Sequence, residues 1–162
     1  NYESRTWRLV MHVNVTAPFM MTQALLPLLE KSEDASVIFT SSSVGVQGKA
    51  YWGAYSASKF ATEGLAQVLA EETENTSKIR VNIINPGATR TNMRAQAYPG
   101  EDPALNLAPE DIMPAYQYLL GPDSLGITGQ RFNAQEMPKP QKEEAKITDE
   151  DSKVTDDKSK KS

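Results

Sequence analysis

Apolar residues recur at helical spacing over residues 3–31. The positions on this stripe are Trp7, Val10, Met11, Val13, Val15, Phe19, Met20, Ala24, Leu25, Leu28 and Leu29. This period is typical of an amphipathic helix. Pro18 and Pro27 interrupt the stretch, and a proline inside a helix removes a hydrogen bond and crowds the preceding turn. The pattern therefore predicts a helical region that kinks or breaks rather than one straight helix.

Two short apolar runs predict buried strands at residues 36–41 (SVIFTS) and 79–84 (IRVNII). Residues 54–74 lie between them and again show the helical period. The glycine-rich stretch 45–53 precedes this helix and predicts a loop.

The remainder of the chain has weaker patterns. Residues 88–108 lack clear periodicity and predict a mobile loop with at most a short helix. Residues 109–120 predict a helix that Pro109 opens, since proline is well suited to a first helical turn. Residues 130–134 (QRFNA) predict a last short strand.

Helix and strand patterns thus alternate along the chain, which predicts an α/β fold with a parallel sheet covered by helices. Three strands are few for such a sheet, whose edge would be left unpaired. We therefore expect residues 1–135 to form the C-terminal half of a Rossmann-like, doubly wound sheet that begins elsewhere. The first residue is Asn1 rather than Met, which also leads us to expect a fragment or a processed piece.

Residues 136–162 differ in composition. Eight of them are acidic and seven are basic, and few are apolar. Such a segment cannot bury enough surface to offset its chain entropy. We expect a disordered tail there, with an interaction segment as the alternative.

Composition narrows the classes of function. The chain has 162 residues, a net charge of −4 and a pI near 5.1, so nothing suggests a nucleic-acid or anionic-membrane partner. It has no Cys, and His12 is its one histidine, so we expect no metal site. No apolar run approaches the roughly 18 residues of a membrane helix, and no signal peptide is visible. We expect a cytoplasmic protein.

Tyr55 and Lys59 are the sharpest chemical signal. They stand four residues apart in a predicted helix, so they lie one turn apart on one face. An ammonium about 5 Å from a phenol at an effective dielectric of about 20 favours the phenolate by about 3 kcal/mol, or about two pKa units. Such a pair also occurs by chance in many helices, so its surroundings decide its meaning.

Two strand ends supply those surroundings. Ser42 follows the first predicted strand, and Asn85-Pro86-Gly87 ends the second. Ligands of open α/β sheets bind at the carboxyl ends of parallel strands. A serine hydroxyl there can donate to a carbonyl oxygen. Ser41 and Ser43 are alternatives, and the spacing to Tyr55 favours Ser42.

The set Ser42, Tyr55-x-x-x-Lys59 and Asn85-Pro86-Gly87 resembles the classical short-chain dehydrogenases/reductases. The stretch VIFTSSSVGVQGKAYWGAYSASKFATEGLAQVLAEE is similar to their catalytic segment throughout, and VNVTAPF and ITGQRFNA also match. The segments WGAYSASKFATEG and NPGATRTNMRA are most similar to those of the bacterial YciK-like oxidoreductases. The resemblance covers residues 1 to about 135.

This resemblance implies an oxidoreductase that transfers a hydride between a nicotinamide and a carbonyl or alcohol compound. Tyr55 would be the general acid or base, and Lys59 would lower its pKa and bind the nicotinamide ribose. Ser42 would orient the substrate oxygen, and Asn14 would hold a water in the proton relay to Lys59.

The cofactor-binding residues implied by the resemblance are Tyr55, Lys59, Pro86, Gly87, Thr89 and Thr91. Thr89 stands where the family usually has valine or isoleucine, a departure that a backbone contact tolerates. Thr91 would contact the carboxamide or a phosphate. The cofactor would be NADP or NAD, with NADP weakly favoured.

The family's Gly-rich phosphate loop has no counterpart here, so the pyrophosphate would lack its helix N-terminus. The alternative function is therefore a truncated, inactive piece that acts through interaction or dimerisation. By resemblance, helices 3–31 and 54–74 would build a homo-oligomer interface.

Four further residues remain open. Tyr51 and Trp52 either line the pocket or pack on the sheet. Arg90 and Arg94 either meet an anion of the substrate or cofactor or are ordinary solvated arginines. The sequence does not indicate the substrate itself.

Overall fold

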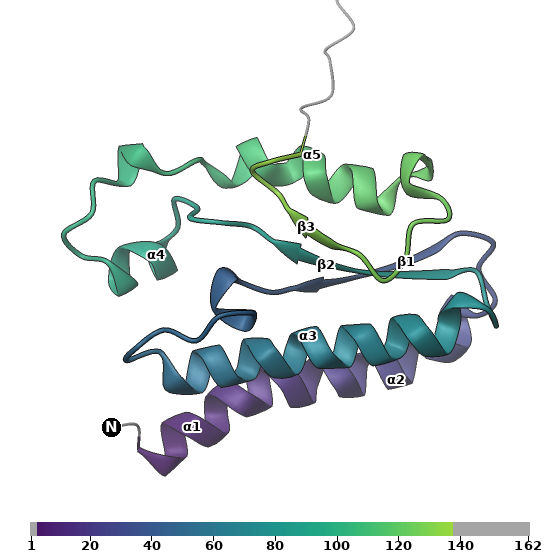
Figure 1. The fold of residues 1–162 in the computed structure, drawn as a ribbon, viewed down its shortest axis with the longest axis horizontal. Coiled ribbons are helices and arrows are strands. Elements are labelled where there is room, and N and C mark those ends of the chain that lie inside the picture. Colours follow the sequence, from purple (N-terminus) through teal and green to yellow (C-terminus); the bar gives the residue numbers. More distant parts are fainter. Residues whose placement is uncertain (1–2, 138–162) are drawn as a thin grey trace, which may run out of the picture.

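Three parallel strands carry the fold, as the alternating pattern predicts. The computed structural model describes residues 3–137. The sheet has the order β1-β2-β3, with β1 at Ala35–Thr40, β2 at Ile79–Asn85 and β3 at Arg131–Asn133. Figure 1 shows α1 (Ser4–Met11), α2 (Ala17–Leu29) and α3 (Gly53–Glu74) on one face and α5 (Pro109–Leu120) on the other. The predicted α/β class with a parallel, helix-covered sheet is confirmed.

Side chains of β2 alternate between two cores, because successive strand residues point to opposite faces. Ile79, Val81 and Ile83 pack against α3, and Ile84 packs against α5. The α3-side core comprises Ala35, Phe39, Ala66, Leu69, Ala70, Ile79, Val81 and Ile83. The α5-side core comprises Ile84, Ile112, Ala115, Leu119 and Ala134. Both cores hold β2 at the centre of the sheet.

Polar residues of β2 fasten the segment that leads into β3. Buried Arg80 donates to the Ser124 hydroxyl, and Asn82 donates to the Ile127 carbonyl at 2.8 Å and accepts from the Gln130 N–H at 3.1 Å. Buried polar groups cost free energy unless they are paired, so these bonds let a central strand carry them.

The strand register brings the carboxyl ends together. Thr40 pairs with Ile84, and Asn85 pairs with Asn133. Just beyond β1, the Ser41 N–H donates to the Ile84 carbonyl at 2.8 Å. The residues that follow β1 and β2 therefore leave the sheet at one edge.

The N-terminal helical region departs from α-helical geometry at a π-helical turn, His12–Thr16, and not at the prolines that were expected to kink or break it. Pro18 lies in the first turn of α2, where its missing N–H costs little, and Pro27 lies inside the same helix. A π turn carries an extra residue and often marks a functional position. Asn14 is its central residue.

The helical run Ser4–Leu29 is long and apolar enough to cross a membrane by length and composition alone. This differs from the expectation that no stretch has the required length. The continuous run of helical turns through His12–Thr16 explains the difference, because the prolines do not end it. None of this run is buried within residues 3–137, although α1 contacts α3, so length and composition are the only features it shares with a membrane helix.

Residues 88–108 are more ordered than predicted. They contain α4 (Asn92–Ala97) and a 3₁₀ turn at Pro103–Leu105, and Thr89 forms a bridge with Leu107. Arg94 on α4 makes a bidentate ion pair with Glu101, which lies just before the 3₁₀ turn. Local charge pairing, which periodicity does not reveal, therefore shapes this segment.

The predicted tail 136–162 lies outside the described residues except for its first two. Met137 packs against the α5-side core, so the packed part of the chain extends at least two residues beyond the predicted boundary at 135.

Candidate active site

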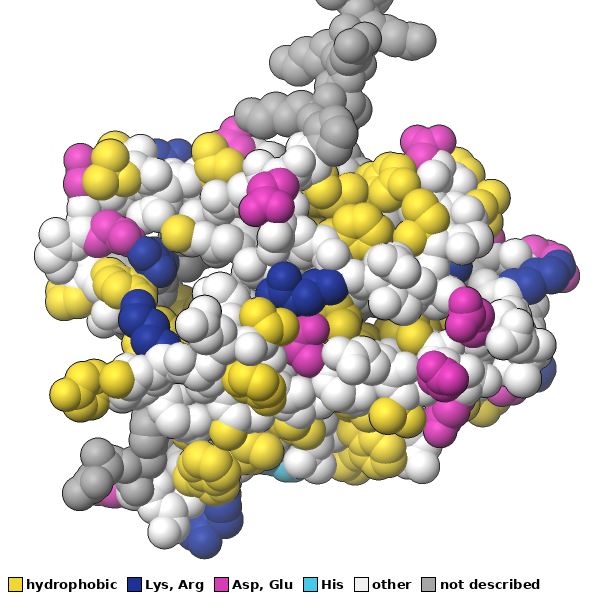
Figure 2. Space-filling model, viewed as in Figure 1, with side chains coloured by type: hydrophobic (Ala, Val, Ile, Leu, Met, Phe, Trp, Pro, Cys, Tyr) yellow, Lys and Arg dark blue, Asp and Glu magenta, His cyan; other side chains and the backbone are white. Residues whose placement is uncertain are grey.

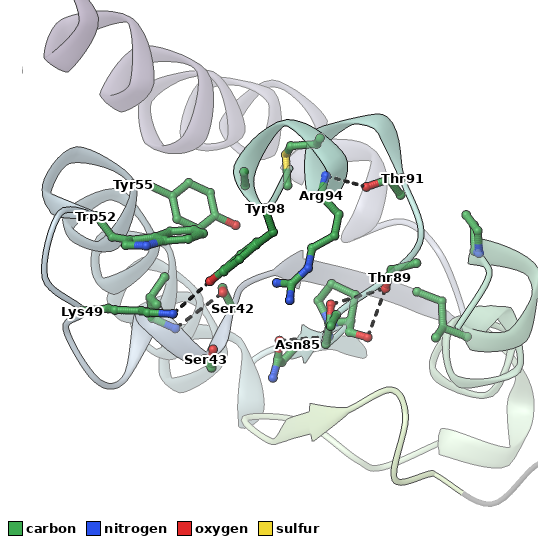
Figure 3. A pocket seen from close by; sticks show the side chains of 18 residues that line it. Ser42, Ser43, Lys49, Trp52, Tyr55, Asn85, Thr89, Thr91, Arg94 and Tyr98 are labelled. Atoms are coloured by element: carbon green, nitrogen blue, oxygen red, sulfur yellow. Dashed lines mark hydrogen bonds between the residues drawn. The ribbon is translucent and has the colours of Figure 1, made fainter. Parts of the chain in front are cut away.

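A cavity of about 490 Å³ lies at the carboxyl ends of β1 and β2 (Figure 3). Six of the predicted site residues line it: Ser42, Tyr55, Pro86, Gly87, Thr89 and Thr91. Asn14 and Lys59 instead line a neighbouring cavity of about 480 Å³ between α2 and β1. The structure thus gathers the predicted residues around one strand edge, in two adjoining spaces.

Ser42 and Tyr55 form the centre of the first cavity. Ser42 accepts from the Val44 N–H at 3.4 Å and caps the 3₁₀ turn Ser43–Gly45. Its side chain also acts on the pKa of Tyr55, which stands in the first turn of α3 and lines the same cavity. Ser43 lines the cavity too, whereas the hydroxyl of Ser41 is buried without a partner among the described residues. Among the three serines, only Ser42 both lines the cavity and acts on the Tyr55 pKa.

Lys59 stands one helical turn after Tyr55 and is half-buried. Its Nζ donates to the Thr40 carbonyl at 2.8 Å and lies 5.6 Å from the centroid of the Tyr55 ring. The last carbonyl of β1 thereby holds the ammonium between the sheet and the phenol.

The pKa values differ from the expected direction. Burial raises the pKa of Tyr55 above its ordinary value, and the hydrogen bond from Ser42 opposes that rise. Burial also lowers the pKa of Lys59. The net shift of the Tyr55 pKa is therefore upward rather than downward, because desolvation of the phenolate dominates, and the expected effect of Lys59 on this pKa stays a prediction. Tyr55 stands ready as a proton donor.

Asn14 links the π turn to the catalytic helix. Its side chain donates to the Ser58 hydroxyl at 3.0 Å, and that hydroxyl donates to the Tyr55 carbonyl at 2.7 Å. The Asn14 carbonyl accepts from the Thr62 hydroxyl at 3.1 Å. Through these bonds the π turn fixes the first turns of α3 and places Asn14 beside the cavity that Lys59 lines.

The turn after β2 faces Ser42 and Tyr55 across the first cavity (Figure 3). Gly87 has a φ of 73°, a left-handed conformation that glycine adopts without strain. The Asn85 side chain accepts from the Gly87 N–H at 3.1 Å. The sequence did not indicate Gln135, whose amide donates to the carbonyls of Pro86 at 3.1 Å and Ala88 at 2.8 Å.

Thr89 and Thr91, the two threonines that follow this turn, hydrogen-bond to backbone groups. The Thr89 hydroxyl donates to the Gly87 carbonyl at 3.3 Å, and Thr91 caps α4 by accepting from the Arg94 N–H at 3.2 Å. Such a cap stabilises a helix by about 1 kcal/mol. The Thr91 hydroxyl still has its own proton to donate, so its expected contact with a cofactor stays a prediction.

Gly45 permits a close approach between the turn after β1 and α3. A Cβ at this position would lie 2.6 Å from the Ser41 hydroxyl and 3.1 Å from both the Cβ and the carbonyl oxygen of Lys59. Only a residue without a side chain lets the serine turn pack directly on the helix that carries Lys59.

An ion pair between a buried carboxylate and an exposed arginine also supports the serine turn, and the sequence did not indicate it. Glu63 on α3 is buried and accepts from the Arg131 guanidinium at 3.0 Å. Arg131 on β3 also donates to the Ser42 carbonyl at 3.2 Å. The partners are far apart in the sequence, so no local pattern could reveal them.

Aromatic and basic side chains form the outer wall of the first cavity. The Trp52 ring meets Tyr55 edge-on at 5.7 Å and lies 5.8 Å from Tyr98. Lys49 donates to the Tyr98 hydroxyl at 2.9 Å. Trp52 and Arg94 line the cavity, whereas Tyr51 is 98% exposed and does not. Arg90 lies outside the lining as well.

These residues fit the nicotinamide end of a dinucleotide. The cavity has the size of a small-molecule site, a half-buried ammonium lies beside it, and the Gly87 turn presents backbone on the opposite side. Among residues 3–137, no three His, Asp or Glu side chains gather as metal ligands would.

Comparison with known proteins agrees with this geometry. The uncharacterized oxidoreductase YciK of Escherichia coli is 60% identical over 136 residues, which are 84% of this chain and 53% of that protein. A 3alpha-hydroxysteroid dehydrogenase of Mediterraneibacter gnavus is 33% identical over 138 residues, which are 80% of this chain and 55% of that protein. The chain spans about half the length of these relatives.

Solved structures give the same result. A short chain dehydrogenase from Salmonella enterica superposes with a TM-score of 0.81 at 59% identity, covering 83% of this chain and 55% of that one. One from Escherichia coli, complexed with NADPH, superposes with a TM-score of 0.80 at 59% identity, over the same shares. The short chain dehydrogenase family model matches residues 1–102. This chain belongs to the short-chain dehydrogenase family.

Proposed function

We propose that this chain carries the catalytic end of an NAD(P)-dependent oxidoreductase that interconverts a carbonyl compound and an alcohol. The observation that carries the proposal is that Ser42 and Tyr55 line one cavity at the strand ends, where Ser42 acts on the pKa of the Tyr55 phenol. Two hydroxyls directed at one point can bind one substrate oxygen together.

Tyr55 is the acid–base group of the proposed reaction. In reduction its O–H gives a proton to the substrate oxygen, and in oxidation its phenolate takes that proton back. When bound, the nicotinamide would supply or accept the hydride at the carbon that bears this oxygen, so that carbonyl, hydride and proton together give the alcohol. The raised pKa of Tyr55 keeps it protonated at neutral pH, which suits the reductive direction.

Ser42 and Lys59 act beside it. Ser42 donates to the substrate oxygen and stabilises the negative charge that develops there. The Lys59 ammonium stabilises the phenolate left on Tyr55, and Asn14 lies at the cavity through which Lys59 would regain a proton by way of water. Each role needs a residue that the fold already holds in place.

The cofactor of the proposal is NADP. NADPH is bound to a structural neighbour that is 59% identical to this chain. Tyr55 and Lys59 would contact the ribose, and Pro86, Gly87 and Thr89 would contact the nicotinamide. Thr91 would contact the carboxamide or a phosphate.

The test compares Tyr55→Phe with Tyr51→Phe, which removes a phenol hydroxyl outside the cavity. Because the relatives are about twice as long, both variants are made in this chain and in a fusion to the N-terminal half of the 60% identical relative. We expect Tyr55→Phe to lower NADPH-dependent carbonyl reduction about 10²–10⁴-fold, the range for general acids. Unchanged turnover in Tyr55→Phe would refute the assignment, and inactivity of every protein would favour a non-catalytic interaction piece.

A second role, self-association, rests on the apolar surface of the first and third helices. Figure 2 shows apolar side chains gathered along the edge formed by α1 and α3. The exposed residues of α1, α2 and α3 include Trp7, Leu9, Phe19, Met20, Met21, Leu25, Leu28, Phe60 and Val68. A patch of this kind marks an interface more often than free surface.

Light scattering tests this role with Val68→Glu, since Val68 is 57% exposed on α3. We expect wild type to behave as a dimer or larger and Val68→Glu to shift toward the monomer. Leu105→Glu, at an 80% exposed position away from these helices, is the control. A monomeric wild type would contradict the role.

A further inference from the structure

The outer wall of the active-site cavity has an excess of positive charge. Two of its lining residues, Lys49 and Arg94, are cations, and none of its lining residues is Asp or Glu. Figure 2 shows basic side chains on both sides of the hollow between α4 and the segment before α3. The two cations differ in how they are neutralised.

Arg94 is already satisfied. Its guanidinium makes two hydrogen bonds to Glu101, at 2.7 and 2.6 Å, and its Cζ lies 3.8 Å from the Tyr98 ring centroid. A fork occupied by one carboxylate has little left for another.

Lys49 has no acidic partner among the described residues. The four ion pairs of residues 3–137 involve Lys78, Arg80, Arg94 and Arg131. Lys49 instead donates to the Tyr98 hydroxyl at 2.9 Å and lies 5.5 Å from the Trp52 ring centroid. Lys49 is exposed, and these two contacts hold its ammonium at the wall of the cavity.

The contact with Tyr98 prepares a site for an anion. A phenol oxygen that accepts from an ammonium keeps its own O–H to donate, and the ammonium keeps two further N–H groups. An incoming carboxylate would therefore meet two donors held 2.9 Å apart. Charge-assisted bonds of this kind are the strong ones.

The position of Lys49 relative to Ser42 and Tyr55 indicates which class of ligand could contact it. In Figure 3 Lys49 lies on the side of Ser42 and Tyr55, and Asn85 and Thr89 lie on the opposite side. A compound whose carbonyl oxygen rests on Ser42 and Tyr55 can extend along the Trp52 and Tyr98 rings toward Lys49. The apolar wall suits a flat or aromatic body between its two polar ends.

We propose that the substrate is an aromatic or apolar carbonyl compound, or the matching alcohol, that carries a carboxylate held by Lys49 and the Tyr98 hydroxyl. This substrate class rests on the proposed oxidoreductase function. Lys49 and Tyr98 determine specificity and take no part in proton or hydride transfer.

The first test measures binding without turnover. Trp7 and Trp52 are the only tryptophans, so Trp7→Phe leaves Trp52 as the single fluorescent reporter. We expect benzoate to change this fluorescence saturably and benzamide to do so much more weakly. Lys49→Met should weaken benzoate binding about 10- to 100-fold, the range for a lost hydrogen bond to a charged group. Equal binding of benzamide, or unchanged benzoate binding in Lys49→Met, would overturn the proposal.

The second test separates this proposal from the proposed function. The fusion protein is assayed with NADPH on 4-carboxybenzaldehyde and on its methyl ester. We expect Lys49→Met to raise KM for the acid about 10- to 100-fold with little change for the ester. Lys49→Arg should restore much of the preference, and Lys31→Met, on a distant surface, should have no effect. Suppose that reduction of the ester depends on Tyr55, but Lys49→Met does not change KM for the acid relative to the ester. The proposed substrate class is then wrong, and the proposed oxidoreductase function stands. If turnover does not depend on Tyr55, the function is wrong, and the benzoate titration still decides the anion site.

One more outcome concerns the source of the anion. A cofactor phosphate offers charge to the same cations, so NADPH is titrated against wild type and Lys49→Met. We expect equal affinity. A loss of NADPH affinity in Lys49→Met would assign Lys49 to the cofactor and overturn the proposal.

Discussion

The two walls of the active-site cavity are built in different ways. The reacting wall, Ser42 with Tyr55 and Lys59, is tied to the sheet and α3 through backbone carbonyls, a glycine contact and an ion pair to a buried carboxylate. The outer wall, Lys49, Trp52, Arg94 and Tyr98, comes from a loop and a short helix that are joined by ring and charge contacts. Chemistry thus rests on groups that cannot move without disturbing the core. The proposed selectivity rests on groups that can be exchanged at little cost in folding.

The largest expected effect breaks the support of the reacting wall. Arg131→Met removes the partner of buried Glu63 and the donor to the Ser42 carbonyl. We expect a loss of about 3 kcal/mol in the free energy of unfolding, because a buried carboxylate is left unpaired. Chemical denaturation measures it, and adding Glu63→Gln should recover part of the loss. A stable Arg131→Met protein with normal turnover would show that the pair does not support the wall.

Gly45→Ala tests the close approach between the serine turn and α3. The added Cβ would meet the Ser41 hydroxyl at 2.6 Å and the Lys59 backbone at 3.1 Å. We expect a loss of about 1–3 kcal/mol from overpacking, together with lower turnover on acid and ester substrates alike. Gly64→Ala, within α3 and with open space around it, should instead gain up to about 1 kcal/mol. Equal effects of the two substitutions in thermal unfolding would contradict this account.

Gln135→Leu tests whether the turn after β2 affects cofactor binding without affecting the outer wall of the cavity. The side chain is exposed, so loss of its bonds to the Pro86 and Ala88 carbonyls should cost less than about 1 kcal/mol of stability. The turn it holds would face the nicotinamide, so KM for NADPH should rise about 3- to 10-fold while the acid-to-ester preference stays unchanged. Gln67→Leu on α3 is the control. A changed substrate preference would mean that the two walls are not independent.

The smallest effect concerns acid stability of the outer wall. Hydrogen bonds from Arg94 and then Asn106 lower the pKa of Glu101 from 4.5 to about 2. A depressed folded-state pKa contributes stability that is present above pH 4.5 and is lost as pH falls toward 2. Glu101→Gln should therefore lose less stability than wild type between these pH values, as thermal melts would record. Glu110→Gln is the control, and parallel melting curves for wild type and Glu101→Gln would contradict the pairing.

Much of the reacting wall could be predicted because its geometry is local. Tyr55 and Lys59 stand one helical turn apart in any helix, and Ser42 and Pro86 each follow a strand that apolar patterning identifies. The supports of that wall could not be predicted in the same way. Glu63 and Arg131 are 68 residues apart, and Lys49 and Tyr98 are 49 apart. No period or motif connects residues across such distances.

The sequence by itself determined the alternation of helices and strands, the parallel sheet, the side chains at its carboxyl edge and the family resemblance. The first three follow from periodicity and spacing, which act within a few residues, and the resemblance follows from the match of whole motif segments. Only the tertiary structure decided the direction of the Tyr55 pKa, because burial depends on what packs around the phenol. It also decided which cation on the outer wall is paired with a carboxylate, because Glu101 reaches Arg94 and no described carboxylate reaches Lys49. Desolvation and charge pairing are properties of three-dimensional neighbours, and the chain order does not encode them directly.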